Sequence, residues 1–64
     1  MLNREVLKMF KIEFKTGGAA FDEPYKASEI KRILEEIAAK VECGYYSGKI
    51  IDINGNNVGE WELS

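Results

Sequence analysis

The strongest structural signal in this chain is an Asn54-Gly55 pair that lies between two apolar, strand-like runs. The surrounding residues, 47–63, read SGKIIDINGNNVGEWEL. Asn-Gly flanked by apolar residues is a strong hairpin signal, because both residue types accept the positive φ angles of a tight strand reversal. The sequence therefore predicts two antiparallel strands joined by a short turn in the last third of the chain.

The register of this hairpin decides which side chains share a face of the sheet. A two-residue loop at Gly55-Asn56 places Ile50 opposite Trp61. A three-residue loop instead places Asp52 opposite Glu60, and like charges in that position destabilise a sheet. The two-residue loop is therefore favoured, and it puts apolar side chains on both faces: Ile50, Trp61 and Leu63 on one, and Ile51, Ile53 and Val58 on the other.

Residues 29–44, EIKRILEEIAAKVECG, carry the signature of an amphipathic helix. Apolar side chains recur at i, i+3, i+4, i+7 and i+11 from Ile30, which aligns them on one face. Ser28 is the expected N-cap, although Pro24 allows an earlier start, and Gly44 suits the left-handed residue that ends a helix. The opposite face is predicted to be solvated and carries Glu29, Lys31, Arg32, Glu35, Glu36 and Lys40.

Residues 10–14 alternate apolar and charged side chains, as a half-buried strand does. The Gly17-Gly18 pair that follows is a signal for a two-residue hairpin, which places Phe14 opposite Phe21 in a short second strand. The intervening Ala-Ala, residues 19–20, has poor strand propensity, so an irregular loop is the alternative.

These elements predict one α+β domain over residues 9–64, with a single helix packed on a three- or four-stranded, mainly antiparallel sheet. The expected order is β-β-α-β-β, and it becomes β-α-β-β if the Gly17-Gly18 hairpin does not form. The expected core consists of Phe10, Ile12, Phe14, Phe21, Ile30, Ile33, Leu34, Ile37, Val41, Ile50 or Ile51, Trp61 and Leu63.

Residues 1–8, MLNREVLK, lack the strand and helix patterns of the rest of the chain. Residues 3–6, NREV, can be encoded by codons that contain a purine-rich bacterial ribosome-binding sequence just ahead of the Met9 codon. We therefore expect residues 1–8 to be a translated leader or a disordered segment. The competing interpretation is a short helical arm whose apolar residues cover an edge of the domain.

The residue inventory argues against catalysis. The chain has no His and a single Cys, so it lacks the usual near-neutral base and cannot form an intramolecular disulfide. Cys43 lies beside Glu42 at the expected C-terminal end of the helix, where a thiolate is disfavoured. We predict a non-enzymatic protein without a cofactor or a metal.

The segment from Asp52 to Asn56 resembles the start of a calcium-binding loop, in which alternate oxygens wrap the ion. Such a loop needs Gly at its sixth position and Glu at its twelfth, where this chain has Asn57 and Leu63. The segment is therefore predicted to be a turn rather than a calcium site.

Charge and hydropathy point to protein partners rather than to nucleic acid or a membrane. The chain has a net charge of −2, and its basic residues are interleaved with acids, so the electrostatic footprint of a duplex-binding protein is missing. It has no apolar run that would span a bilayer and no signal-peptide pattern. Together with the lone cysteine, this predicts a cytoplasmic protein.

A chain of 64 residues with one helix covers little more than one face of its sheet. Either a β-bulge near Gly48 or Gly59 corrects the phase of the last two strands, or the second apolar face meets a protein partner or another copy of the chain. The predicted function is a protein-interaction module, self-associating or binding another protein, with Ile51, Ile53, Val58, Tyr45 and Tyr46 as candidate interface residues.

The alternative function is that of a small single-stranded nucleic-acid-binding or regulatory protein. Tyr45, Tyr46 and Trp61 would then form a stacking platform for bases. Acidic residues in the same region oppose a polyanion, so the protein-interaction function is favoured. The lysines that would support the alternative are Lys11, Lys15 and Lys49.

Three segments carry a resemblance to a known group of proteins: FKIEFKTGGAAF at 10–21, EIKRILEEIAAKVECG at 29–44 and SGKIIDINGNNVGEW at 47–61. In these segments the chain resembles small proteins encoded in prophages and conjugative elements of Gram-positive bacteria. No activity is established for that group, so no functional residue carries over. What the resemblance implies is a setting alone, namely bacterial, intracellular and accessory to a mobile element.

Overall fold

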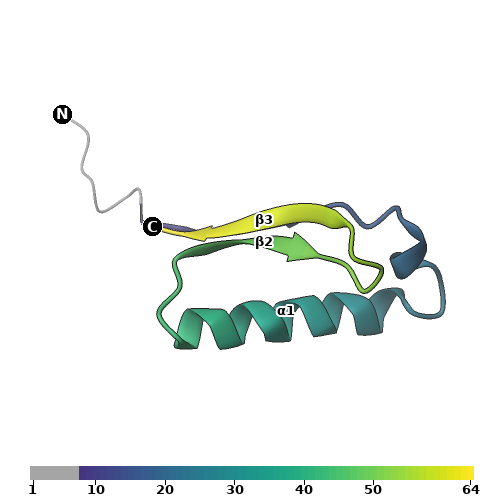
Figure 1. Cartoon of the computed structure of the whole chain (residues 1–64), viewed down its shortest axis with the longest axis horizontal. Coiled ribbons are helices and arrows are strands. Elements are labelled where there is room, and N and C mark those ends of the chain that lie inside the picture. The colour runs from purple at the N-terminus through teal and green to yellow at the C-terminus, as the bar shows by residue number, and fades with distance from the viewer. Residues whose placement is uncertain (1–7) are drawn as a thin grey trace.

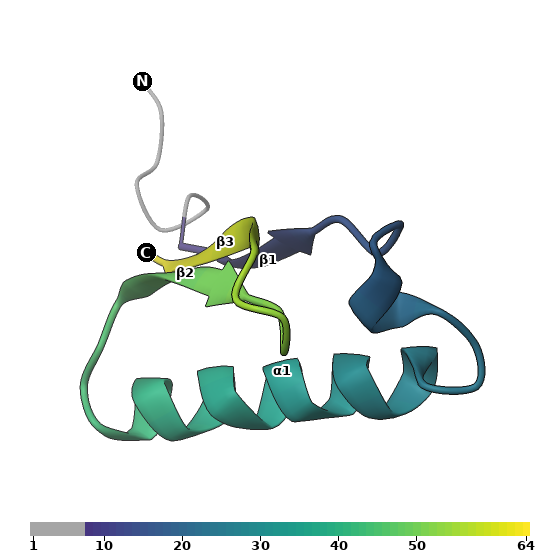
Figure 2. The same cartoon turned by 45° about the vertical axis from the view of Figure 1, so that its right-hand side comes forward.

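Residues 8–64, the part of the chain that this computed structural model describes, fold into two layers (Figure 1). The expectations for residues 1–7 lie outside the described residues. In chain order the elements are β1 (Phe10–Phe14), the 3₁₀ helix η2 (Ala19–Phe21), α1 (Lys26–Glu42), β2 (Ser47–Ile51) and β3 (Asn57–Leu63). The strands form an antiparallel sheet in the order β1-β3-β2, and α1 runs along one face of it (Figures 1 and 2).

The α+β class is confirmed, and the order of elements is β-α-β-β, the alternative to the favoured four-stranded order. The predicted strand at residues 19–21 is wrong, because this segment is η2. Ala20 and Phe21 are both buried, and consecutive residues of a strand would point to opposite faces. The helical turn still brings Phe21 against Phe14, with ring centroids 6.0 Å apart.

Helix α1 begins earlier than Ser28. Tyr25 occupies the N-cap position without a side-chain hydrogen bond, so the early start after Pro24 is confirmed. The prediction of Ser28 as N-cap is wrong, because its hydroxyl lies inside the first turn and donates to the Tyr25 carbonyl at 3.0 Å. At the other end Gly44 has a φ of 96°, which confirms it as the left-handed residue that ends the helix.

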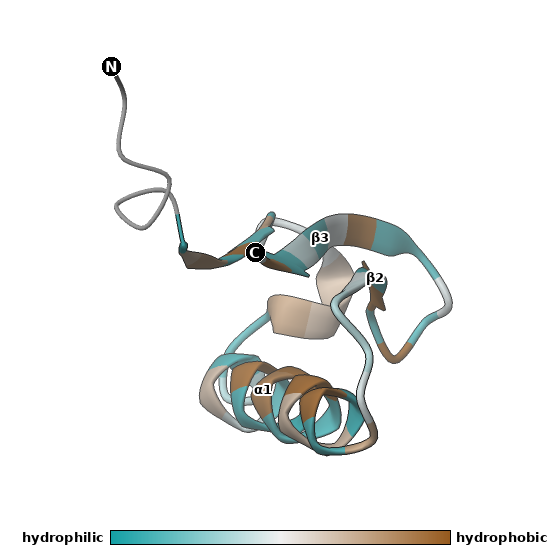
Figure 3. Ribbon diagram, turned by 90° about the vertical axis from the view of Figure 1, so that its left-hand side faces the viewer, coloured by the Kyte–Doolittle hydropathy of each residue, from teal (hydrophilic) through white to brown (hydrophobic). Residues whose placement is uncertain are grey.

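The core lies between α1 and the centre of the sheet, and Trp61 of the central strand is its most buried large side chain. Figure 3 shows apolar residues on the side of α1 that faces the sheet. The prediction that Phe10 and Leu34 belong to the core is wrong, because they are 50% and 44% exposed. The buried apolar residues are Ala20, Phe21, Ile33, Ile37, Ile50 and Trp61.

The last two strands adopt neither of the two registers considered from the sequence. Ile50 pairs with Gly59, and Gly48 pairs with Trp61. Because this register differs by two residues from the favoured one, the same side chains still face the core. Ile50 and Trp61 are buried there, and Leu63 packs against them.

The hairpin loop explains the difference in register. The Asp52 N–H donates to the Asn56 carbonyl at 2.9 Å, and the Gly55 N–H donates back to the Asp52 carbonyl at 2.9 Å. Three residues, 53–55, therefore form the loop. Gly55 alone adopts a positive φ, 86°, within it, whereas a two-residue turn of the expected kind needs two such residues.

A β-bulge corrects the phase of these strands, as one of the two sequence-based alternatives predicted. The pairing changes from Ile50 with Gly59 to Ile51 with Asn57, which leaves Val58 as the extra residue. Val58 packs against the core instead of extending a second apolar face. That predicted apolar face is wrong, because the face away from α1 is mainly charged and carries Lys11, Glu13, Lys15, Lys49, Glu60 and Glu62.

Gly59 should be the glycine of the sheet that is least tolerant of substitution. A Cβ atom at this position would overlap the Glu13 carbonyl and lie 2.6 Å from Phe14 Cα, so β1 would have to move away from β3. We expect Gly59→Ala to lower the free energy of unfolding by about 1–3 kcal/mol in urea denaturation. Gly17→Ala is the control, since nothing lies within 4 Å of its Cβ position. Equal stability of the two variants would contradict this account of the β1–β3 contact.

Candidate interaction surface

The edge of β1 that faces away from β3 pairs with no strand of residues 8–64. The Lys15 N–H donates to the Val58 carbonyl at 2.9 Å, in register with the β1–β3 pairing, so odd-numbered residues bond to β3. In an antiparallel pair the alternate residues turn their backbone groups the other way. The N–H and C=O groups of Phe10, Ile12 and Phe14 therefore point to this side, here called the open edge.

An apolar groove of about 710 Å³ runs beside the open edge, between β1 and α1. Phe10 remains half-exposed in it although its ring packs edge-on against Trp61, with centroids 6.1 Å apart. An exposed apolar groove beside the unpaired edge of a strand is a typical site for adding an extended segment. The groove, here called the β1 groove, is lined by Phe10, Ile12, Leu34, Ala38 and Val41 among others.

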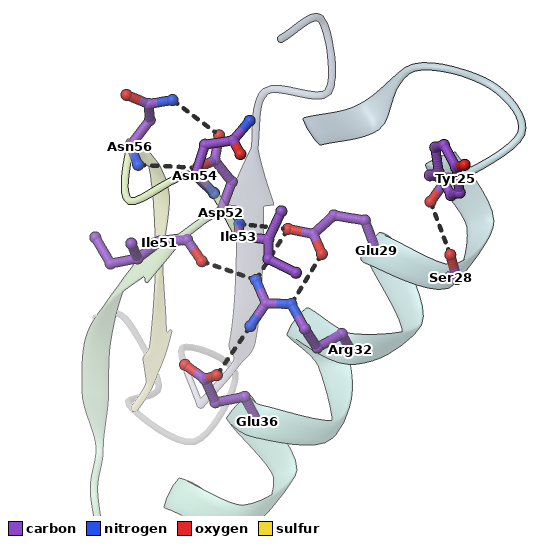
Figure 4. A network of polar contacts seen from close by, with 10 residues as sticks. All are labelled: Tyr25, Ser28, Glu29, Arg32, Glu36, Ile51, Asp52, Ile53, Asn54 and Asn56. Carbon is purple, nitrogen blue, oxygen red and sulfur yellow. Dashed lines mark hydrogen bonds and ion pairs between the residues drawn. The ribbon is translucent and has the colours of Figure 1, made fainter. Parts of the chain in front are cut away.

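The opposite edge of the sheet is better covered. The Arg32 guanidinium donates to the Ile51 carbonyl of β2 at 3.1 Å (Figure 4). The cavity left between α1 and β2 is only about 10 Å³. Among residues 8–64 the helix thus packs closely against the β2 side of the sheet and leaves the β1 side less covered.

Glu29, only 5% exposed, fastens α1 to the β2–β3 loop (Figure 4). Its carboxylate accepts two hydrogen bonds from Arg32, at 2.8 and 2.9 Å, and one from the Ile53 N–H at 2.8 Å. The hydrogen bonds from Arg32 lower the pKa of Glu29 below its ordinary 4.5; burial raises it, and the Ile53 N–H lowers it further. The hydrogen bonds that Arg32 donates to Glu29 in turn raise the pKa of Arg32.

The buried side chain of Asp52 stabilises the hairpin loop through hydrogen bonds to the loop backbone. Its Oδ1 accepts hydrogen bonds from the backbone N–H groups of Asn54 and Asn56, both at 2.9 Å, and its Oδ2 accepts one from the Asn56 side chain at 3.3 Å. This is the turn chemistry expected of an Asp at the start of a loop. The carboxylate oxygens are used to hold the loop, in keeping with the turn that the sequence predicted here.

The residues predicted as an interface do not form one surface. Ile51 and Ile53 are exposed at the hairpin-loop end of β2, whereas Tyr45 and Tyr46 are exposed in the α1–β2 link, at the other end of β2. Val58 packs against the core. None of these five residues lines the β1 groove.

The stacking platform considered for nucleic acid is incomplete. Trp61 is buried in the core, so it is not available to stack on bases as the alternative function would require. Tyr45 and Tyr46 are exposed, and the Lys40 ammonium lies 5.6 Å from the ring centroid of Tyr45. On the sheet Lys49 lies opposite Glu60, which weakens any attraction for phosphates.

Residues 8–64 contain no group of three or more His, Cys, Asp or Glu side chains that could hold a metal ion. No helix in this range has the length and apolar character needed to cross a bilayer. Cys43 is an exposed free thiol.

Sequence reasoning missed both the β1 groove and the Glu29–Arg32 link. Phe10 and Leu34 read as core residues, because periodicity shows which side of an element is apolar but not how far the opposing layer extends. Glu29 and Arg32 read as part of a solvated face. Their opposite charges, three residues apart on a helix, could have predicted the ion pair. Nothing in the sequence marks the Ile53 N–H as a further partner of Glu29.

The Glu29 link should make stability depend on pH in the acidic range. A pKa lowered by folding means that the carboxylate stabilises the fold above its ordinary 4.5 and that this contribution is lost as the pH falls through the lower, folded-state value. We expect Glu29→Gln to lower the free energy of unfolding by about 1–3 kcal/mol at pH 7. The difference from the unsubstituted chain should shrink towards pH 3.

Urea denaturation between pH 3 and pH 7 measures this difference. The exposed Glu35→Gln is the matched control and should keep the pH dependence of the unsubstituted chain. A constant difference between Glu29→Gln and the unsubstituted chain over the whole range would contradict the role assigned to Glu29.

Comparisons with family models, with curated proteins and with solved structures find no match to this chain. The resemblance to proteins of mobile elements therefore stays a proposal.

Proposed function

We propose that this chain is a non-enzymatic protein-interaction module that binds an extended segment along the open edge of β1. The observation that carries the proposal is the coincidence of unpaired backbone groups with the apolar groove beside them. Backbone hydrogen bonds supply affinity in such strand addition, and pockets for alternate side chains supply specificity. Here the side chains that point towards α1 would enter the β1 groove.

The proposed setting is the cytoplasm of a bacterium, in the service of a mobile element. It follows from the resemblance and from the lone cysteine, which suits a reducing compartment. In that setting such a binding module would act by blocking a surface of another protein or by holding two proteins together. The interface residues proposed from sequence, Ile51, Ile53, Tyr45 and Tyr46, would then serve as secondary contacts.

Site-specific photo-crosslinking tests this proposal. A benzophenone amino acid in place of Leu34 sits in the β1 groove, whereas the same group in place of Lys49 sits on the charged face of the sheet. We expect a protein adduct in producing cells from position 34 and none from position 49. Adding Ile12→Pro should abolish the adduct, because it removes a backbone N–H that points to the open edge.

Two outcomes would contradict the proposal. One is the absence of any adduct from position 34. The other is an adduct that persists unchanged with Ile12→Pro while circular dichroism shows a folded chain, since the partner would then not bind along the strand.

Single-stranded nucleic-acid binding is the second candidate, favoured only by the exposed Tyr45 and Tyr46. We expect no binding of a labelled oligonucleotide, by fluorescence anisotropy, even at low salt. Binding that weakens with salt and falls severalfold in Tyr46→Ala would instead support this candidate.

A further inference from the structure

We propose that the segment added to β1 is β1 of a second copy of this chain, in antiparallel register centred on Ile12. The inference rests on the proposed function and names the partner. In this register Ile12 exchanges both backbone hydrogen bonds with Ile12 of the second copy, and Phe10 does so with its Phe14. These are the residues whose backbone groups point to the open edge.

The charges of β1 select this register. Pairing about Ile12 places Lys11 opposite Glu13 of the second copy, and two-fold symmetry repeats the contact. These positions are the ones without direct hydrogen bonds, where opposing side chains come closest. Centring the pair on Lys11 or on Glu13 would place like charges against each other.

A register centred on Phe14 also brings opposite charges together, through Glu13 and Lys15. It would leave Phe10 without a partner, however, and would pair residues beyond the end of the strand at Phe14. Centring on Ile12 pairs every residue of β1 with a residue of the second β1. It is therefore the register that both pairs opposite charges and uses the full length of the strand.

The β1 groove supplies the apolar part of the interface. A two-fold axis perpendicular to the sheet places both helices on the same side of one continuous sheet, so the two grooves face each other across the paired β1 strands. Phe10 and Leu34 are half-exposed in the single chain. In the pair Phe10 would lie beside Phe14 of the second copy, and Leu34 would face the groove of the second copy. Ala38 of α1 also lines the groove, and its small side chain leaves room for a close approach.

The symmetry of the β1 contact explains why pairing through this edge stops at two copies. An isologous contact uses the open edge of both copies and therefore closes on itself. At the β2 edge the Arg32 guanidinium already occupies the Ile51 carbonyl, and α1 packs closely on that side.

Charge reversal tests the register in solution. We expect the unsubstituted full chain, of 7.3 kDa, to sediment with twice that mass at tens of micromolar. Lys11→Glu and Glu13→Lys each create two like-charge contacts across the pair. Each should weaken dimerisation about tenfold or more.

An equimolar mixture of Lys11→Glu and Glu13→Lys should recover the dimer, because the acidic strand of one variant then faces the basic strand of the other. Lys31→Glu is the matched control, since it makes the same charge change on the exposed face of α1. It should dimerise as the unsubstituted chain does. Thermal unfolding followed by circular dichroism verifies that each variant is folded.

A monomer mass at every concentration would overturn this inference, and so would a dimer whose dissociation constant is the same in Lys11→Glu and Glu13→Lys as in the unsubstituted chain. A monomer that still forms a position-34 adduct with a different protein would refute the second copy and leave the interaction module standing. A monomer that forms no such adduct would overturn both.

Discussion

One helix has to cover a sheet that is wider than itself. An α-helix with its side chains is about 10–12 Å across, whereas strands lie about 4.7–4.9 Å apart, so one helix covers about two of the three strands. In this chain α1 packs closely on the β2 side and leaves the β1 side open. The half-exposed Phe10 and Leu34 are direct consequences of this mismatch in width.

The buried carboxylate of Glu29 decides on which side the mismatch falls. It gathers Arg32 and the Ile53 N–H, and Arg32 in turn reaches the Ile51 carbonyl. Removing one partner would leave the buried Glu29 carboxylate unsatisfied, so these hydrogen bonds hold α1 in one position against the hairpin loop. The helix is thereby anchored to the hairpin loop, away from β1.

The elements that the sequence predicts well are those encoded by local patterns. The apolar spacing from Ile30 to Val41 and the role of Gly44 identify α1, and the alternation in residues 10–14 identifies β1. The hairpin was predicted but not its register, because Asp52 captures two backbone N–H groups and makes Asn54 part of a longer loop. The β1 groove was not predicted, since no local pattern reports how a helix is placed over a sheet.

The central position of β3 also sets an order of assembly. Among residues 8–64, β1 joins the sheet only through β3, which follows all the other described elements in sequence. During synthesis the helix and the β2–β3 hairpin close over short loops, whereas residues 10–14 have no strand to pair with until residues 57–63 have left the ribosome. Long-range pairing of this kind is slow and exposes apolar segments to other chains. β1, the strand that borders the open edge, is thus also the last strand to join the sheet. In each newly made chain β1 is therefore accessible to other chains before the sheet is complete.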